Sequence, residues 1–130
     1  MKRNTIVFIL TIILTATYAF SEDKPLIVFD KTAFNFGKIQ KKTTVKHTFI
    51  FKNKGKATLL IDRVMRGCAC TTVSISSREI PAEGEGRLEI ELNTDYSEGK
   101  IEKKFFVYSN DPDHAMIELT VKADVFIPGN

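Results

Sequence analysis

The feature that most constrains this sequence is a repeated alternation of apolar and polar residues. Three stretches show it clearly, at residues 45–52, 87–93 and 117–125. Apart from His47, every second side chain in these stretches is apolar, which is typical of an antiparallel sheet with one face on a core and the other in water. No stretch after residue 24 carries the i, i+3, i+4, i+7 apolar spacing of an amphipathic helix. The pattern therefore predicts an all-β chain.

Shorter and less regular strands are expected between the clear ones. They fall at residues 27–29, 34–39, 59–64 and 101–108. Turn residues separate them, and Gly55 is expected to supply a positive φ in the turn at 53–56. About seven short strands predict an immunoglobulin-like antiparallel β-sandwich. The chain has no Trp, so Phe49, Phe51 and Phe105 are the expected centre of its core.

Charge is divided unevenly along the chain. Residues 38–66 are rich in Lys and Arg, and residues 79–102 are rich in Asp and Glu. The second and fifth strands of a seven-strand sandwich are neighbours, so Lys46 and Lys52 are expected to face Glu89 and Glu91. Such cross-strand pairs contribute only about 0.2–1 kcal/mol each. We interpret the charge division as strand pairing rather than as a basic ligand-binding patch.

The first residues have the three parts of a secretory signal peptide. Lys2 and Arg3 precede an apolar run at 6–14, and small residues follow. Cleavage after Ala19 and cleavage after Ser21 both fit, and an uncleaved membrane anchor is the alternative. We expect a signal peptide at 1–21 and one sandwich domain at 22–130, exported to the periplasm, the cell surface or the medium.

Composition limits the partners of the exported domain. The 130 residues carry a formal net charge of +3, which falls to +1 without Lys2 and Arg3. A nearly neutral domain has no large field to bring it onto nucleic acid or an anionic membrane. We therefore expect no binding to nucleic acid. Because no second apolar stretch is long enough to cross a bilayer, we also expect no membrane span after the signal is removed.

The most unusual segment is Cys68-Ala69-Cys70, which contains both cysteines of the chain. Two cysteines exclude a multi-disulfide scaffold and a four-thiolate zinc site. In an extended strand their Cβ atoms would lie about 6–7 Å apart, whereas a disulfide needs about 3.5–4.5 Å. A bridge would therefore require a tight turn, and closing so small a loop contributes only about 1.6 kcal/mol.

Around this segment the sequence resembles a bacterial family of exported immunoglobulin-like proteins. The family is known as domain of unknown function fifteen seventy-three and is related to the ciliary Hydin-type domains. The motifs that carry the resemblance are FNFGKI at 34–39, FIFKNKG at 49–55, LLIDRV at 59–64, CACTT at 68–72, IPAEG at 80–84 and YSND at 108–111. The family usually has glycine where this chain has Ala69. The resemblance implies the fold and the export, and it implies no established activity.

Three interpretations of Cys68 and Cys70 remain open. The pair is buried or bridged for modest stability, or it is a redox-active pair assisted by Arg66. The third interpretation is a copper(I) site, because copper(I) prefers soft sulfur ligands. Its ligands would be Met65, Cys68 and Cys70, with His47 or His114 as additions. His47 lies at an apolar position of its strand, so a core or rim histidine is expected there.

We predict a non-catalytic immunoglobulin-like module, with no cofactor, that binds a protein or has a structural role. Its partner would contact loops at one end of the sandwich or an exposed strand edge. A thiol redox or copper(I)-binding protein is the alternative. The predicted binding residues lie in the loop at 67–72 and the turn at 110–113: Cys68, Cys70, Thr71, Thr72, Asn110 and Asp111.

Overall fold

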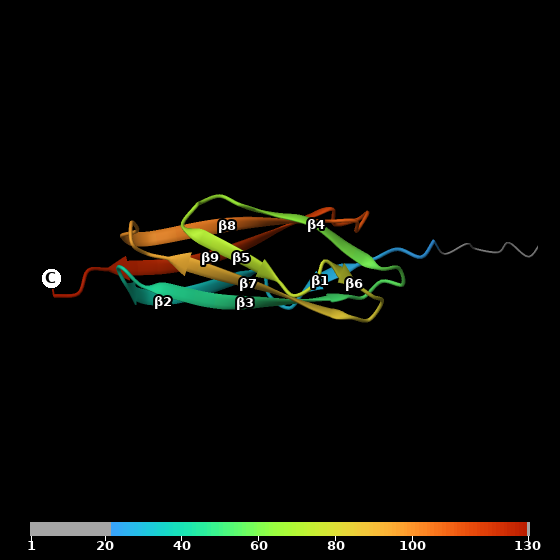
Figure 1. Ribbon diagram of the computed structural model, residues 1–130, viewed down its shortest axis with the longest axis horizontal. Coiled ribbons are helices and arrows are strands. Elements are labelled where there is room, and N and C mark those ends of the chain that lie inside the picture. Colours follow the sequence, from blue (N-terminus) through green and yellow to red (C-terminus); the bar gives the residue numbers. More distant parts are fainter. Residues whose placement is uncertain (1–21, 130) are drawn as a thin grey trace, which may run out of the picture.

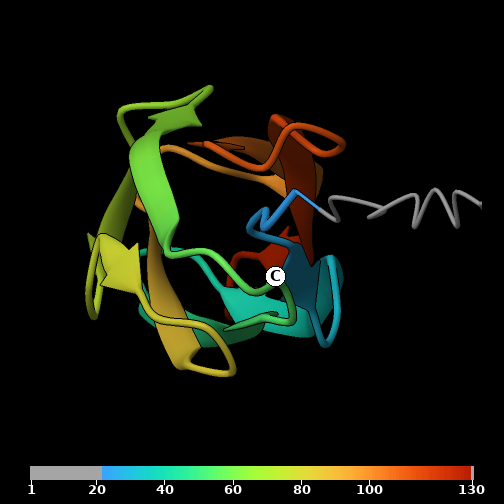
Figure 2. The ribbon, with the colours of Figure 1, turned by 90° about the vertical axis from the view of Figure 1, so that its right-hand side faces the viewer.

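Two β-sheets packed face to face make up the computed structural model, which describes residues 22–129 (Figure 1). The strands are β1 (Ile27–Phe29), β2 (Ala33–Gln40), β3 (Thr44–Asn53), β4 (Leu59–Arg66), β5 (Thr71–Ile75), β6 (Glu79–Ile80), β7 (Glu85–Asn93), β8 (Gly99–Ser109) and β9 (Met116–Phe126). The four-stranded sheet, here called sheet A, has the order β1-β3-β7-β5. The five-stranded sheet, sheet B, has the order β2-β9-β8-β4-β6. Seen end on, the two sheets wrap around a common core (Figure 2).

The prediction of an immunoglobulin-like β-sandwich is confirmed. Nine strands occur among residues 22–129 where about seven were expected. The two strands that the alternation did not reveal are β5, which follows the cysteines, and the two-residue β6. The sandwich is antiparallel except where β2 pairs with β9 in parallel. That pairing arises because the chain changes sheets between β1 and β2.

The core consists of the alternating apolar residues of both sheets. Phe49, Phe51 and Phe105 are 0–1% exposed, as the sequence predicts. Gly86 lies opposite Phe51 in the β3–β7 ladder. A Cβ added at Gly86 would lie 2.2 Å from Cζ of Phe51, so the ring occupies the space that any side chain would need.

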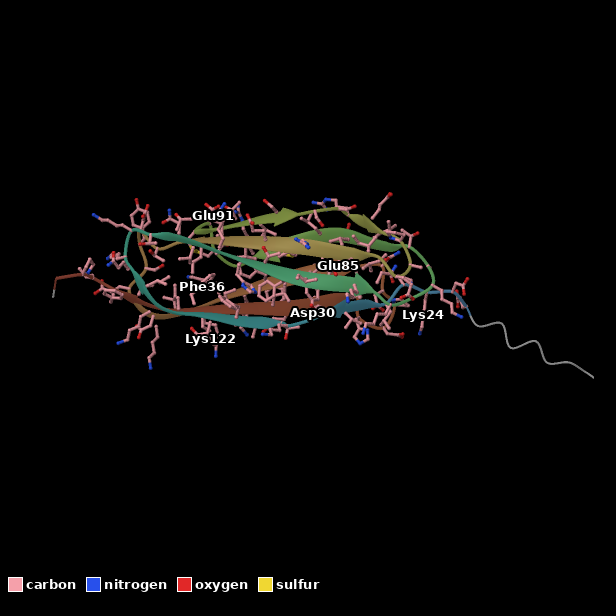
Figure 3. The ribbon with its side chains drawn as sticks, turned by 90° about the horizontal axis from the view of Figure 1, so that it is seen from below. Lys24, Asp30, Phe36, Glu85, Glu91 and Lys122 are labelled. Carbon is pink, nitrogen blue, oxygen red and sulfur yellow. A yellow bond between two sulfur atoms is a disulfide. The ribbon has the colours of Figure 1, made fainter. Side chains whose placement is uncertain are left out.

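Ion pairs on the outer face of sheet A follow the predicted charge pattern. In the β3–β7 ladder Lys46 lies opposite Glu91. Its Nζ is 3.4 Å from a carboxylate oxygen of Glu91 and 3.8 Å from one of Glu89, as expected. The prediction for Lys52 was wrong in its partner, because the register places it opposite Glu85. Figure 3 labels Glu91 and Glu85 along β7.

The turn after β3 differs from the prediction in its glycine. Gly55 does not have a positive φ. Glycine is required there by a close approach, because a Cβ would lie 2.2 Å from the carbonyl oxygen of Lys24. The buried Asn53 holds this turn: its Oδ1 accepts hydrogen bonds from the N–H of Leu26 and of Gly55. Its Nδ2 donates to the carbonyl of Ile80.

The predicted signal peptide and both cleavage positions lie outside the described residues. Within residues 22–129 no helix is long and apolar enough to span a membrane.

Candidate functional site

Both cysteines lie in the connection from β4 to β5, where the chain crosses from sheet B to sheet A (Figure 1). Cys68 and Cys70 form a disulfide with their Cα atoms 5.2 Å apart. The chain turns at Ala69 and Cys70, so the tight turn that a bridge requires is present. The N–H of Cys70 also donates to the Sγ of Cys68 at 3.2 Å.

Hydrogen bonds, in addition to the disulfide, hold this connection at residues 67–70, here called the crossover loop, to the strands on both sides. The Oγ1 of Thr71 donates to the carbonyl of Cys68 at 2.8 Å. The carbonyl of Cys70 accepts from the N–H of Asn93 on β7 at 2.9 Å. From β4, the guanidinium of Arg66 donates to the carbonyl of Thr71. These bonds tie the loop to both sheets through groups other than the sulfurs.

The two half-cystines differ in their surroundings. Cys70 packs against a small end cluster of the core formed by Leu92, Ala123 and Val125. Both half-cystines are half-buried, and Cys68 is not among the residues that pack on this cluster. Thr71 is buried and Thr72 faces solvent. Beside the loop lies a shallow hollow of about 400 Å³ whose lining includes Cys70, Thr72 and Tyr96.

The copper(I) alternative would require Met65 and two free thiolates. Met65 lies on the outer face of β4 and is 48% exposed. The sulfurs of Cys68 and Cys70 are joined to each other in this structure. Among residues 22–129 there is no group of three His, Cys, Asp or Glu side chains suited to a metal ion. The redox and copper interpretations thus stay predictions that concern the reduced chain.

The second predicted site, the turn at 110–113, consists of groups that hold strands together. The side-chain oxygen of Asn110 accepts from the N–H of Leu60, and its amide donates to the carbonyl of Thr58. Asp111 is only 1% exposed. Its carboxylate accepts from the N–H of Ile27 at 3.0 Å. This carboxylate therefore ties the start of sheet A to the β8–β9 turn.

The hydrogen bonds of Asp111 also decide its charge. Burial alone would raise the pKa of this carboxyl, but hydrogen bonds outweigh burial and lower the pKa below its ordinary value. The donors are the N–H groups of Ile27, Asp113 and His114, and the His114 ring. His114 Nδ1 lies 3.3 Å from the carboxylate, and its side chain is 55% exposed.

The structure does not bring the two predicted sites together. β4 and β8 run antiparallel, with Arg66 opposite Phe105 and Ile61 opposite Ser109. The crossover loop therefore lies near one end of the sandwich and the 110–113 turn at the other (Figure 1).

His47 faces the interior, as the sequence predicts. Its imidazole stacks on the ring of Phe34 at 3.7 Å between centroids and meets the edge of Phe49 at 4.7 Å. Burial lowers the pKa of His47, and the positive charge of Lys31 lowers it further. Both effects favour the neutral imidazole, which lies between aromatic side chains of β2 and β3.

The outer face of sheet B carries a group of large apolar side chains that the sequence analysis did not single out as a site. We call it the outer patch; its members are Leu60, Met65, Phe106, Tyr108 and Met116. Cross-strand pairing joins Met65 to Phe106 and Tyr108 to Met116. Met65 and Met116 are each 48% exposed and Leu60 is 43% exposed. The signal in the sequence was the run of bulky residues at 105–108, which places aromatic side chains on both faces of β8.

Arg63 lies at the centre of the outer patch. Its guanidinium carbon is 4.3 Å from the centroid of the Tyr108 ring, in cation–π contact. It also pairs with Asp62 at 3.1 Å. The outer face of sheet A has a different character, since its exposed positions are polar or charged, among them Lys46, Thr48 and Ser74. The two outer faces of the sandwich are therefore chemically distinct.

Solved structures similar to this chain share its fold. A protein of unknown function from Porphyromonas gingivalis W83 is 20% identical with a TM-score of 0.71; the match covers 78% of this chain and 47% of that one. The ASH/PapD-like domain 7 of human CEP192 is 10% identical with a TM-score of 0.67; the match covers 80% of this chain and 87% of that one. The VesB protease of Vibrio cholerae is 11% identical with a TM-score of 0.59; the match covers 78% of this chain and 31% of that one.

At these identities the likeness shows the fold alone, and the chain spans less than half of the Porphyromonas protein. No curated protein matches the sequence. A family model does match, over residues 27–125, which is nearly all of the two sheets. The chain therefore belongs to the family described as protein of unknown function (DUF1573).

Proposed function

We propose that this chain is an exported, non-catalytic module that binds another protein through the outer patch. The observation that carries the proposal is the exposure of Met65 and Met116 beside Phe106 and Tyr108 on one sheet face. A contiguous group of exposed apolar side chains on a soluble domain is typical of a protein-binding surface. Methionine suits such a surface because its flexible thioether adapts to a partner.

The chemistry around the outer patch supports a protein partner. Interfaces are enriched in aromatic residues, methionine and arginine, with polar groups at the rim. The patch has two aromatic rings, two methionines and Arg63. Lys104 and Glu118, paired at 3.1 Å, border it along β8 and β9. The Arg63–Tyr108 stack lies exposed on this face, and Tyr and Arg are the residue types that often supply most of the binding energy once a partner buries them.

The test is site-specific photocrosslinking in cells that produce the protein. p-Benzoylphenylalanine replaces Phe106, which lies in the outer patch, or Thr48, which is exposed on the opposite sheet face. We expect a discrete crosslinked band with the probe at Phe106 and none with the probe at Thr48. A second change, Met116→Lys, should greatly reduce the Phe106 band because it places a charge in the contact.

Two outcomes would contradict the proposal. One is the absence of any band with the probe at Phe106. The other is an equal band from the two positions that Met116→Lys leaves unchanged. Thermal unfolding of each purified variant confirms that the sandwich is intact, since both probe positions are exposed or half-exposed.

A further inference from the structure

The strand position beside β4 at the edge of sheet B is only partly filled. β6 occupies it opposite Leu59 and Leu60, and the N–H of Ile61 still donates to the carbonyl of Arg78 at 2.8 Å. Beyond that point the chain leaves, because the preceding strand, β5, belongs to sheet A. The rest of β4, up to Arg66, has no strand on this side among residues 22–129.

The register identifies the backbone groups that face this vacant position. The N–H of Gly67 donates to the carbonyl of Lys104 on β8. Backbone groups of alternate residues point in opposite directions across an antiparallel ladder, so Met65 also faces β8. Val64 and Arg66 must direct their N–H and C=O groups to the vacant side. In the described part of the chain these four groups have no hydrogen-bond partner.

Two arginines lie at the ends of this open stretch. The guanidinium of Arg66 donates to the carbonyl of Thr71, and that of Arg78 donates to the carbonyl of Asp62 at 2.6 Å. Within residues 22–129 neither arginine pairs with a carboxylate. Val64 is partly buried and lies in β4, two residues before Arg66. The edge thus offers unpaired backbone, an apolar centre and positive charge on both sides.

Resting on the proposed function, we propose that the partner contributes a short extended segment that pairs with the backbone of Val64 and Arg66. Strand addition of this kind satisfies main-chain groups and uses side-chain positions for specificity. The segment would place an apolar residue beside Val64 and acidic residues near Arg66 and Arg78. The side chain of Met65 lies in the outer patch, and its backbone is part of this edge strand. A segment bound along the edge would therefore lie beside the outer patch and enlarge the apolar contact with it.

The edge of sheet A at β5 is chemically different. Val73 and Ile75 of β5 also direct backbone groups away from β7, because the N–H of Ser76 and the carbonyl of Cys70 bond to β7. The side chains next to this edge are Thr72 and Ser74, with Glu91 and Glu89 opposite them. This edge offers neither arginines nor exposed apolar side chains, so it serves as the matched control.

The test selects binders from a phage-displayed library of random peptides about twelve residues long, against the purified mature chain. We expect peptides that alternate apolar and acidic residues. Val64→Pro removes one edge N–H, and Val73→Pro removes the equivalent group of β5. Neither change breaks a bond within the sandwich, because both groups face outward. Val64→Pro should weaken binding by at least about tenfold and Val73→Pro should leave it unchanged.

Arg66→Gln together with Arg78→Gln provides a second test, independent of the folding of the proline variants. Glutamine can keep a hydrogen bond to the carbonyls and removes the charge. We expect at least about tenfold weaker binding and a smaller dependence on salt. Recovery of no peptides, or of peptides whose binding neither set of changes affects, would overturn the inference. Crosslinking at Phe106 in cells decides separately on the proposed function, since that band needs no strand pairing.

Discussion

Removal of the disulfide gives the sharpest test of how the crossover loop is held. Cys68→Ser together with Cys70→Ser deletes the bridge and keeps side chains of similar size. The bridge closes a loop of three residues, since the cysteines are two positions apart. For such a loop the chain-entropy relation gives about 1.6 kcal/mol of stabilisation at 25 °C.

The hydrogen bonds of the loop argue against a larger effect. The bond from the Thr71 hydroxyl to Cys68, the bond from Asn93 to the carbonyl of Cys70 and the Arg66 contact all use groups that the serine variant retains. The double variant should therefore fold, with the free energy of unfolding lowered by about 1–2 kcal/mol. With an m-value of about 1.5 kcal/mol/M, the urea midpoint should fall by roughly 1 M.

The assay is urea unfolding followed by circular dichroism, with the unaltered chain measured with and without reductant. The reduced chain and the double variant should unfold at similar urea concentrations, because both lack the same covalent link. A loss above about 4 kcal/mol, or a variant that does not fold, would refute this reasoning, since the entropy of so short a loop cannot supply it. Intact mass with an alkylating agent and copper(I) tests the redox and copper interpretations on the same samples.

Three further substitutions and one control substitution test the packing and the buried charges. Asp111→Asn should lower stability at pH 7 by about 2–4 kcal/mol, because a neutral amide replaces a buried carboxylate that accepts several N–H groups. The pKa of Asp111 is lowered in the folded state. Its contribution to stability is therefore present above the unfolded pKa and is lost as pH falls through the folded pKa. In an acid titration the Asn variant should lose less stability over this pH range than the unaltered chain. Gly86→Ala forces a Cβ into the ring of Phe51 and should lower the free energy of unfolding by about 3 kcal/mol in urea unfolding. The control is Gly67→Ala, because a Cβ there would lie 3.8 Å from its nearest neighbour. It should change stability by less than about 0.5 kcal/mol. The lowered pKa of His47 means that the unfolded chain binds more protons below about pH 6.5, so stability should decline as pH falls from there, and His47→Gln should reduce that decline in thermal unfolding scans.

Periodicity was sufficient to predict the sandwich because its long strands have one solvent-exposed face and one buried face. The same rule predicted that Phe49 and His47 face inward and that Lys46 faces outward, where ion pairing then follows from the register. It did not reveal β5, because Thr71–Ile75 contains few apolar residues and follows an unusual cysteine motif. An edge strand beside a single neighbour needs only a weak pattern to pair.

The candidate site was less predictable than the fold. Asn110 and Asp111 are polar turn residues, and sequence alone cannot distinguish a turn that meets a partner from a turn that holds its own strands. The distances settle the structural role of both side chains. The outer patch was hidden for the opposite reason, because Phe106 and Met65 look like core residues until the register of β4 and β8 places them on the outer face.

The crossover loop and the vacant strand position both follow from the passage of the chain from sheet B to sheet A after β4. Four residues separate the end of β4 at Arg66 from the start of β5 at Thr71. A connection of this length could also close a hairpin between β4 and β5, but Cys70 is bonded to β7 and the next strand lies in sheet A. β5 lies beside β7 and not beside β4, and only the two residues of β6 return to that edge. Because these ties do not depend on the sulfurs, the edge at Val64 should stay open in the reduced chain, and peptide binding there should survive loss of the disulfide.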